Sequence, residues 1–167
     1  MPATTTFPPD ALAALERDIL ATIPLARAMG LSVTGGADGA LTLTAPLDPN
    51  INDKGCAFGG SLVGLMTLAG WGLLRLALAA RGRTACDIYV VDSMVRYLAP
   101  VRETLKAVAR FDGGTRPDAI LDGLDARGKA RARVHCEIIA GGQPAAVLDA
   151  AFVALRHAGN GEPEPRP

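Results

Sequence analysis

The chain has 167 residues, the length of one ordinary domain with a substantial core of its own. Lysine plus arginine and aspartate plus glutamate number 17 each, so the formal net charge is zero and no overall basic field exists to hold a nucleic acid. The three cysteines, Cys56, Cys86 and Cys136, are too far apart for a disulfide framework or a zinc site, which favours a reducing compartment.

The two ends of the chain have the weakest folding signals. The start, MPATTTFPPD, lacks the basic residues and the apolar run of a secretory signal, and the end, HAGNGEPEPRP, is typical of a disordered tail. We therefore expect a disordered leader over residues 1–9, a single domain over residues 10–157 and a disordered tail over residues 158–167. The missing export signal favours a cytoplasmic location.

The first part of the domain predicts a helix and a hairpin. Apolar residues recur at helical spacing from Leu12 to Ile23, and Pro24 interrupts this helix before a last turn that closes at Gly30. Two short β-rich runs, LSVTGG and ALTLTAP, follow with a turn at residues 37–39 between them. Such runs joined by a glycine-rich turn are typical of a β-hairpin.

A long apolar stretch comes next. From Ala57 to Leu74 it runs eighteen residues without a charge, the length at which a membrane span must be considered. It also holds Gly60 and Gly64 at the spacing of membrane helix dimers. A single span would separate the hairpin from the strands that follow, so we expect no membrane and a core helix from Ala57 to Ala80.

Beyond this stretch the apolar period changes to two. Four strand-like runs are bounded by proline or glycine: CDIYVVDSMVRYLAP, RETLKAVARFD, KARARVHCEIIA and PAAVLDAAFVALR. In the third run polar residues from Lys129 to Glu137 alternate with apolar ones, which predicts one wet and one buried face. Between the second and third runs, Thr115 and Pro117 predict a capped short helix.

These elements together predict an α+β fold, an antiparallel sheet of about five to six strands wrapped around a long central apolar helix. Strands with one face available for burial need an apolar element across them. A sheet curled around one helix buries that helix on most sides, so the helix can be apolar all round.

The element order, with Gly-Gly at the start of the buried helix, resembles the hotdog fold. Asn52, Gly55, Phe58, Gly59 and Gly60 form the pattern N-x-x-G-x-x-F-G-G. This pattern is similar to the N-x-x-G-x-x-H-G-G signature of the PaaI-like acyl-CoA thioesterases, with phenylalanine in place of the usual histidine. NINDKGCAFGGS followed by LAGW is more closely similar to the thioesterase domain of the YiiD C-terminal type, over essentially the whole domain.

The resemblance implies an acyl thioester substrate and a homodimer or dimer of dimers, with active sites between subunits. Coenzyme A, or the phosphopantetheine arm of an acyl carrier protein, would be part of the substrate. No metal and no further cofactor is implied. The expected partners therefore include a second copy of the chain and an acyl carrier protein, but no nucleic acid and no membrane.

The candidate catalytic residues lie around the start of the apolar helix. Gly59 and Gly60 suit an oxyanion site, because a helix start offers free backbone amides and the positive end of the helix dipole. The alternative is that both glycines only permit tight packing. Asn52 is the functional asparagine of the resembled motif and can donate and accept hydrogen bonds, although a turn or capping role is equally open.

Thr67 marks a departure from the wider superfamily. PaaI-like enzymes have an acidic residue seven positions after the second glycine, and here that position is Thr67. A threonine hydroxyl has no useful basicity near neutral pH, and residues 57–74 contain no charged residue. Hydrolysis by the usual carboxylate is therefore not expected, although Thr67 keeps the catalytic position.

Five further residues are candidates for substrate binding. Asp53 stands beside the motif, and Asp92 either enters the site from the partner subunit or forms an ion pair. Cys56 is interpreted as a small buried residue rather than as a nucleophile, since no histidine is near it in sequence. Ser61 is expected to cap or line the helix start, and Phe58 to line the site.

Three functions follow from this pattern. The first is an acyl thioester hydrolase in which Asn52 and the helix-start amides polarise the carbonyl group while water attacks. The second is a decarboxylase of malonyl thioesters, which needs the same donors for an enolate oxygen but no general base, and which would support the start of fatty-acid synthesis. The third is a catalytically silent module that binds acyl chains.

Overall fold

The computed structural model of the protein describes residues 6–157. Residues 1–5 of the predicted leader and all of the predicted tail, residues 158–167, therefore lie outside the described residues. Within the rest of the leader, Phe7 is buried and its amide donates a hydrogen bond to the Gly36 carbonyl at 2.8 Å. This contact places the leader against the turn of the first hairpin.

Two helices open the fold. Helix α1 spans Pro9–Thr22 and helix α2 spans Pro24–Ala28. Ile23 between them is extended, because a residue before proline is disfavoured in the helical region. The break predicted at Pro24 is thus confirmed, and α1 buries Leu15 and Ile19 in the core.

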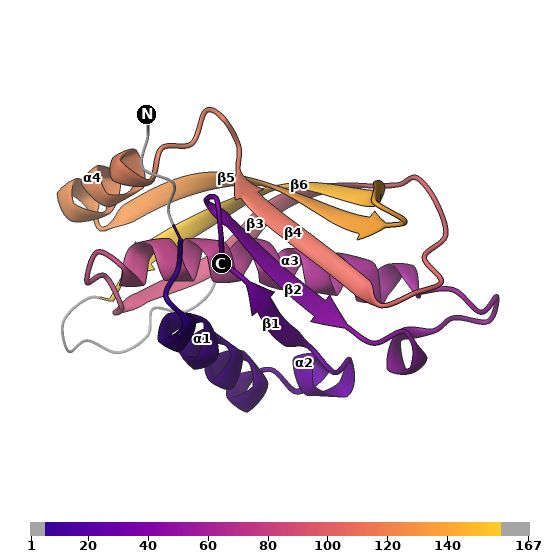
Figure 1. The fold of residues 1–167 in the computed structure, drawn as a ribbon. Helices are drawn as coiled ribbons and strands as arrows, with labels where there is room; N and C mark the ends of the chain where they lie inside the picture. The colour runs from indigo at the N-terminus through magenta and orange to yellow at the C-terminus, as the bar shows by residue number, and fades with distance from the viewer. Residues whose placement is uncertain (1–5, 158–167) are drawn as a thin grey trace.

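Six strands form one antiparallel sheet in the order β1-β2-β4-β5-β6-β3 (Figure 1). Their bounds are Ser32–Gly35 for β1, Ala40–Ala45 for β2, Cys86–Tyr97 for β3, Leu105–Phe111 for β4, Lys129–Ala140 for β5 and Gln143–Arg156 for β6. β3 comes third in the chain but pairs with the last strand, so the sheet closes through a contact that is distant in sequence.

The predicted core helix is α3, Gly59–Ala79. It lies along the inside of the curved sheet (Figure 1) and contacts β2, β3, β4, β5 and β6. By length and composition it could cross a membrane, yet more than half of its most apolar window is buried within the protein. The sheet therefore wraps around the apolar helix, as the sequence predicted, and the α+β hotdog fold is confirmed.

Helix α4, Pro117–Arg127, packs against β5 and lies beside the start of that strand (Figure 1). Arg81 and Arg83, which follow α3, pair with Asp118 and Asp125 of α4 at 2.6 and 2.7 Å. These four side chains join the two helices at the surface.

The predicted capping role of Thr115 is wrong. The residue before the first turn of α4 is Arg116, and no side chain caps this helix. The Thr115 hydroxyl instead accepts a hydrogen bond from the Arg133 amide of β5 at 3.0 Å. Thr115 therefore joins the loop before α4 to the sheet, a contact that local sequence spacing does not reveal.

Strand β3 is an edge of the sheet, and its register contains a bulge. The pairing with β6 shifts between Val90 and Asp92, so that Val91 is an extra residue. Val90 pairs with buried Phe152, whereas Asp92 and Met94 pair with residues of the outer sheet face. The bulge thus turns the Asp92 face away from α3.

The β3 edge is also the most apolar exposed part of the described residues. Its exposed large apolar side chains are Tyr89, Val90, Val91, Met94 and Tyr97, with Leu98 directly after the strand. An edge strand of twelve residues with this composition is normally covered by a further strand or by another chain.

Candidate active site

The loop before α3 is fixed by a buried asparagine. The short 3-10 helix η1, Asp48–Asn50, ends at Asn50, the one buried polar residue of the described chain. Its Nδ2 donates to the carbonyl oxygens of Met29 and Pro46 at 2.8 and 2.7 Å. Its own carbonyl accepts from the Phe58 amide at 2.7 Å. The residue just before α3 is thereby held against the body of the protein.

Asn52 shapes the next part of this loop. Its Oδ1 accepts from the amides of Lys54 at 2.8 Å and Cys56 at 3.2 Å, which is the pattern of an Asx turn. Its Nδ2 donates to the Cys56 sulfur at 3.3 Å, a weak acceptor. The loop therefore donates two hydrogen bonds to Oδ1 of Asn52, whereas the Nδ2 group of Asn52 makes only a weak contact.

Two backbone amides are left without a partner at the start of α3. The amides of Ser61 and Leu62 donate to the Phe58 carbonyl, but no described residue accepts a hydrogen bond from the amide of Gly59 or Gly60. No side chain of the described chain caps this helix end. Two donors at the positive end of a 21-residue helix form a ready-made site for an oxyanion.

Two aromatic rings explain why these positions are glycines. A Cβ atom on Gly59 would lie 3.3 Å from Cε1 of Tyr97, and one on Gly60 would lie 2.9 Å from Cζ of Phe58. A side chain at Gly60 would therefore require the exposed Phe58 ring to move, and one at Gly59 would fit only tightly against Tyr97. The same packing keeps side chains away from the free amides, so the two interpretations are compatible.

A hollow of about 330 Å³ opens beside the helix start. It is lined by the loop, by the first turn of α3 and by the end of β3 with the residues after it: Cys56, Ala57, Gly59, Leu62, Tyr97, Leu98, Ala99, Pro100 and Val101. Its volume is at the lower end of ligand pockets, which are mostly apolar with few polar groups. None of these nine residues is a carboxylate, a histidine or a lysine.

Several predicted site residues lie outside this hollow. Thr67 is two turns further along α3, about 12 Å from Gly59 at 1.5 Å per residue. It lines a second, apolar hollow of about 280 Å³ with Trp71 and Ile88 among others. Asp92 is on the outer sheet face, because of the β3 bulge.

Asp53 and Ser61 also lie outside the hollow, although they are close to it in sequence. Asp53 is exposed and pairs with Lys54 at 2.9 Å. Ser61 is half-buried in the first turn of α3 but does not cap it. Of the nine predicted site residues, Cys56 and Gly59 line this hollow. Asn52, Phe58 and Gly60 adjoin them in the loop and at the helix start, whereas Asp53, Ser61, Thr67 and Asp92 are not brought to the hollow within one chain.

The cysteines away from the helix start are poor nucleophiles. Burial raises the pKa of the Cys86 thiol above its ordinary value and that of Cys136 to about 12. A thiol with a raised pKa forms little of the reactive thiolate near neutral pH. All three cysteines are buried and free, and no group of three or more potential metal ligands occurs among the described residues.

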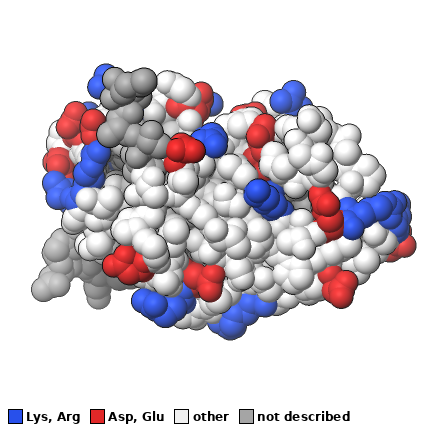
Figure 2. All heavy atoms as spheres, in the orientation of Figure 1, with Lys and Arg blue, Asp and Glu red and all other residues white. Residues whose placement is uncertain are grey.

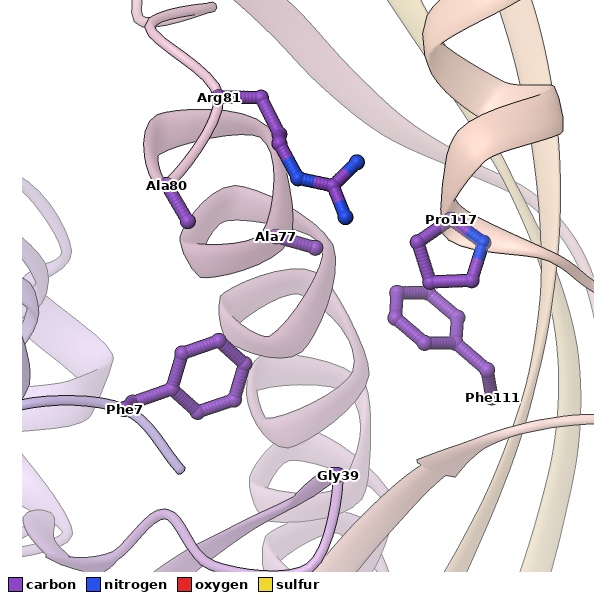
Figure 3. Close-up of a pocket in the computed structure, with 7 residues that line it drawn as sticks. All are labelled: Phe7, Gly39, Ala77, Ala80, Arg81, Phe111 and Pro117. Carbon is purple, nitrogen blue, oxygen red and sulfur yellow. The ribbon is translucent and has the colours of Figure 1, made fainter. Parts of the chain in front are cut away.

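A third cavity lies at the opposite end of α3 and holds none of the predicted residues. Figure 3 shows its two aromatic rings and the Arg81 guanidinium around the last turn of the helix; the lining is Phe7, Gly39, Ala77, Ala80, Arg81, Phe111 and Pro117. Its volume is about 90 Å³, well below that of ordinary ligand pockets. It is therefore a packing gap rather than a candidate site.

Charge is dispersed on the visible surface. On the face drawn in Figure 2, basic and acidic side chains alternate around the rim and the middle is largely uncharged. This distribution agrees with the zero net charge of the chain and leaves no continuous basic field on that face.

The fold and the amide-lined helix start define a hotdog protein of the thioesterase type. The chain belongs to the family described as "Putative thioesterase (yiiD_Cterm)", which matches residues 12–156. This match confirms the resemblance found in the N-x-x-G-x-x-F-G-G pattern.

Solved structures show the same architecture. A "putative thioesterase" from Shewanella oneidensis is 30% identical with a TM-score of 0.80, over 87% of this chain and 98% of that chain. A protein of unknown function from Chlorobaculum tepidum is 27% identical with a TM-score of 0.83, over 91% and 98%. A "Probable Thioesterase" from Pseudomonas aeruginosa, 21% identical with a TM-score of 0.70 over 92% and 99%, shares the fold.

Sequence reasoning missed one polar residue of the hollow, Tyr97. It belongs to the last run before the loop at Pro100, and no motif marks it. Only the antiparallel course of β3 along α3 brings the end of the strand to the start of the helix. The order of the elements in the sequence therefore indicates a place for Tyr97 in the hollow only when the pairing of β3 is already known.

Proposed function

We propose that this protein is a hydrolase of acyl thioesters carried by coenzyme A or by an acyl carrier protein. The observation that supports it is the pair of unpartnered amides, Gly59 and Gly60, next to an apolar hollow of about 330 Å³. A thioester carbonyl oxygen placed at these amides would receive both hydrogen bonds. No metal and no further cofactor is part of this proposal, and a cytoplasmic location remains a prediction.

Hydrolysis would use the helix start as an oxyanion site. A water oxygen adds to the carbonyl carbon, and the negative charge gathers on the oxygen held by the amides. The carbon–sulfur bond then breaks, a proton of the water passes to the sulfur, and an acid and a thiol leave. One such donor contributes about 3–4 kcal/mol to lowering the barrier in measured cases.

Asn52 would add a side-chain donor. Its Nδ2 contacts only the Cys56 sulfur, at 3.3 Å, and a carbonyl oxygen is a much better acceptor than a thiol sulfur. Exchange of this contact for the thioester would cost little, while Oδ1 keeps the loop in place. Thr67, Asp53, Ser61 and Asp92 would then act only in the assembled protein.

A second reaction, decarboxylation of a malonyl thioester, is favoured by one observation. The nine residues around the hollow include no carboxylate, histidine or lysine. In this reaction the bond between the α-carbon and the carboxylate breaks and carbon dioxide leaves. The electron pair forms an enolate held by the amides, and a proton from solvent then gives the acetyl thioester. No base is needed, and no carboxylate in the hollow repels the substrate.

The expected partner is a second copy of the chain at the β3 edge. β3 has twelve residues, one unpaired side and a row of exposed apolar side chains. Antiparallel pairing of two such edges would satisfy the free backbone groups and cover the apolar side chains. The second hollow, with Thr67, lies beside the same strand and would be covered too.

The test is turnover of defined thioesters. Purified protein is incubated with malonyl-CoA, malonyl carrier protein and a series of saturated acyl-CoA substrates, while free thiol and product masses are followed. Free thiol with the intact acid supports hydrolysis. An acetyl thioester without free thiol supports decarboxylation instead. Tight binding with no turnover of any substrate would favour the acyl-binding module.

A further inference from the structure

Tyr97 is, with Cys56, one of the two polar side chains that line the hollow, and it lies directly beside the start of α3. It is the last residue of β3, and its ring lies across Gly59. Its Cε1 and Oη atoms are 3.3 and 3.4 Å from the position that a Cβ atom on Gly59 would take. The phenol group therefore lies at the wall of the hollow, next to a free amide.

The hydroxyl proton of Tyr97 has no firm acceptor in the described chain. Among the described residues, its one hydrogen-bond contact is with the Gly59 carbonyl oxygen at 3.5 Å. Good bonds between two oxygens are about 2.5–3.0 Å long, so this contact is weak. Tyr97 is 58% exposed in the single chain and lines the hollow, and no strong bond has to break before its hydroxyl meets a ligand there.

We propose that the Tyr97 hydroxyl is a third donor to the thioester carbonyl oxygen, beside the Gly59 and Gly60 amides. The proposal rests on the function proposed above. A Cβ position lies about 2.5 Å from the nitrogen of its own residue. Oη is therefore within about 6 Å of the Gly59 nitrogen, which allows one oxygen to accept from both at about 2.9 Å.

A neutral phenol suits this role for either reaction. It stabilises charge on a carbonyl or enolate oxygen without placing a negative charge near the substrate. The other titratable side chain of the hollow, Cys56, is buried and already bonded to Asn52. Tyr97 is thus the side chain of the hollow that is best placed to add a donor.

The experiment compares Tyr97→Phe with Thr34→Val. Phenylalanine keeps the ring that packs on Gly59 and removes only the hydroxyl, so a purely structural Tyr97 would be left intact. Thr34→Val also removes one hydroxyl, but Thr34 is exposed on β1 at the opposite edge of the sheet and lines neither hollow. Both variants are first compared with the wild type by thermal unfolding and by their oligomeric state.

Turnover is then measured with whichever thioester the wild-type protein converts. We expect Tyr97→Phe to lower kcat by about 10²-fold, as for loss of one oxyanion donor, with a much smaller change in KM. Thr34→Val should keep the wild-type kcat. A Tyr97→Phe protein with wild-type kcat would overturn the role of Tyr97 and leave the proposed function standing. A wild-type protein that converts no thioester would overturn both.

Discussion

The ring of Phe152 rests directly on Gly70 in the middle of α3. Its Cε2 and Cζ atoms lie 2.9 and 3.0 Å from the position that a Cβ atom on Gly70 would take. Phe152 is fully buried in β6, so a Cβ atom on Gly70 would force packed core atoms to shift. The sheet can therefore pack closely on α3 at this point because Gly70 has no side chain.

Gly70→Ala should destabilise the protein. Overpacking of a core costs about 1–3 kcal/mol, which outweighs the roughly 1 kcal/mol that alanine gains over glycine in a helix. Gly64→Ala is the matched control, because its Cβ atom would meet only Met29 at an ordinary 3.6 Å. We expect that variant to be stabilised by about 0.5–1 kcal/mol in urea unfolding. Equal effects at both positions would contradict this account of the packing.

Asn52→Ala and Asn52→Asp separate the two roles of this side chain. Aspartate keeps the acceptor for the Lys54 and Cys56 amides but removes the Nδ2 donor. We expect Asn52→Asp to unfold like the wild type and to lose about 10²-fold or more in kcat, as removal of an oxyanion donor does. Asn52→Ala should lose stability as well. Wild-type turnover by Asn52→Asp would show that Asn52 acts through the loop alone.

His135 makes the stability of the outer sheet face depend on pH. Its Nδ1 lies 2.7 Å from Asp149 and its Nε2 lies 3.5 Å from Glu137, while Arg110 is its partner on β4. The hydrogen bond to Asp149 raises the pKa of His135, against an opposing effect of burial, and Glu137 raises it further. A raised pKa in the folded state means that this stabilisation is complete below the unfolded pKa of 6.5. It is lost as the pH rises through the folded pKa.

The check is urea unfolding of wild type and His135→Gln at pH 6 and pH 9. The variant should be less stable at pH 6 by at most about 1 kcal/mol, since the ion pair is exposed, and the gap should shrink at pH 9. Asp149→Asn should lower the pKa of His135 in an NMR titration. A stability gap that grows toward pH 9 would have the opposite sign and would refute this account.

Met94→Lys tests the proposed dimer at the β3 edge. Met94 is 67% exposed near the middle of this strand, and a lysine on an edge strand opposes pairing with another chain. We expect the wild type to sediment as a dimer and Met94→Lys to shift toward the monomer at low concentration. Arg96→Lys, on the same strand and with unchanged charge, is the control. An unchanged dimer in Met94→Lys would place the interface elsewhere.

Local patterns in the sequence determined most of the elements. The alternation from Lys129 to Glu137 was enough to predict a strand with one wet face, and β5 has that burial pattern. The uncharged run from Ala57 predicted the core helix, and the following strands predicted the sheet around it. Each of these signals acts between residues close in sequence, where hydrophobic periodicity sets which face is buried. The cap predicted at Thr115 failed, because a contact with Arg133 of the sheet replaced it.

The sequence by itself also predicted the candidate site at the start of α3, since Asn52, Gly59 and Gly60 belong to one contiguous motif. Only the tertiary structure decided which distant residues join that motif. Pairing of β3 with β6 carries Tyr97 to the helix start, and one extra residue, Val91, turns Asp92 outward. The physical reason is that strand order and bulges depend on pairing between segments far apart in the chain, and side-chain alternation within one strand does not specify them.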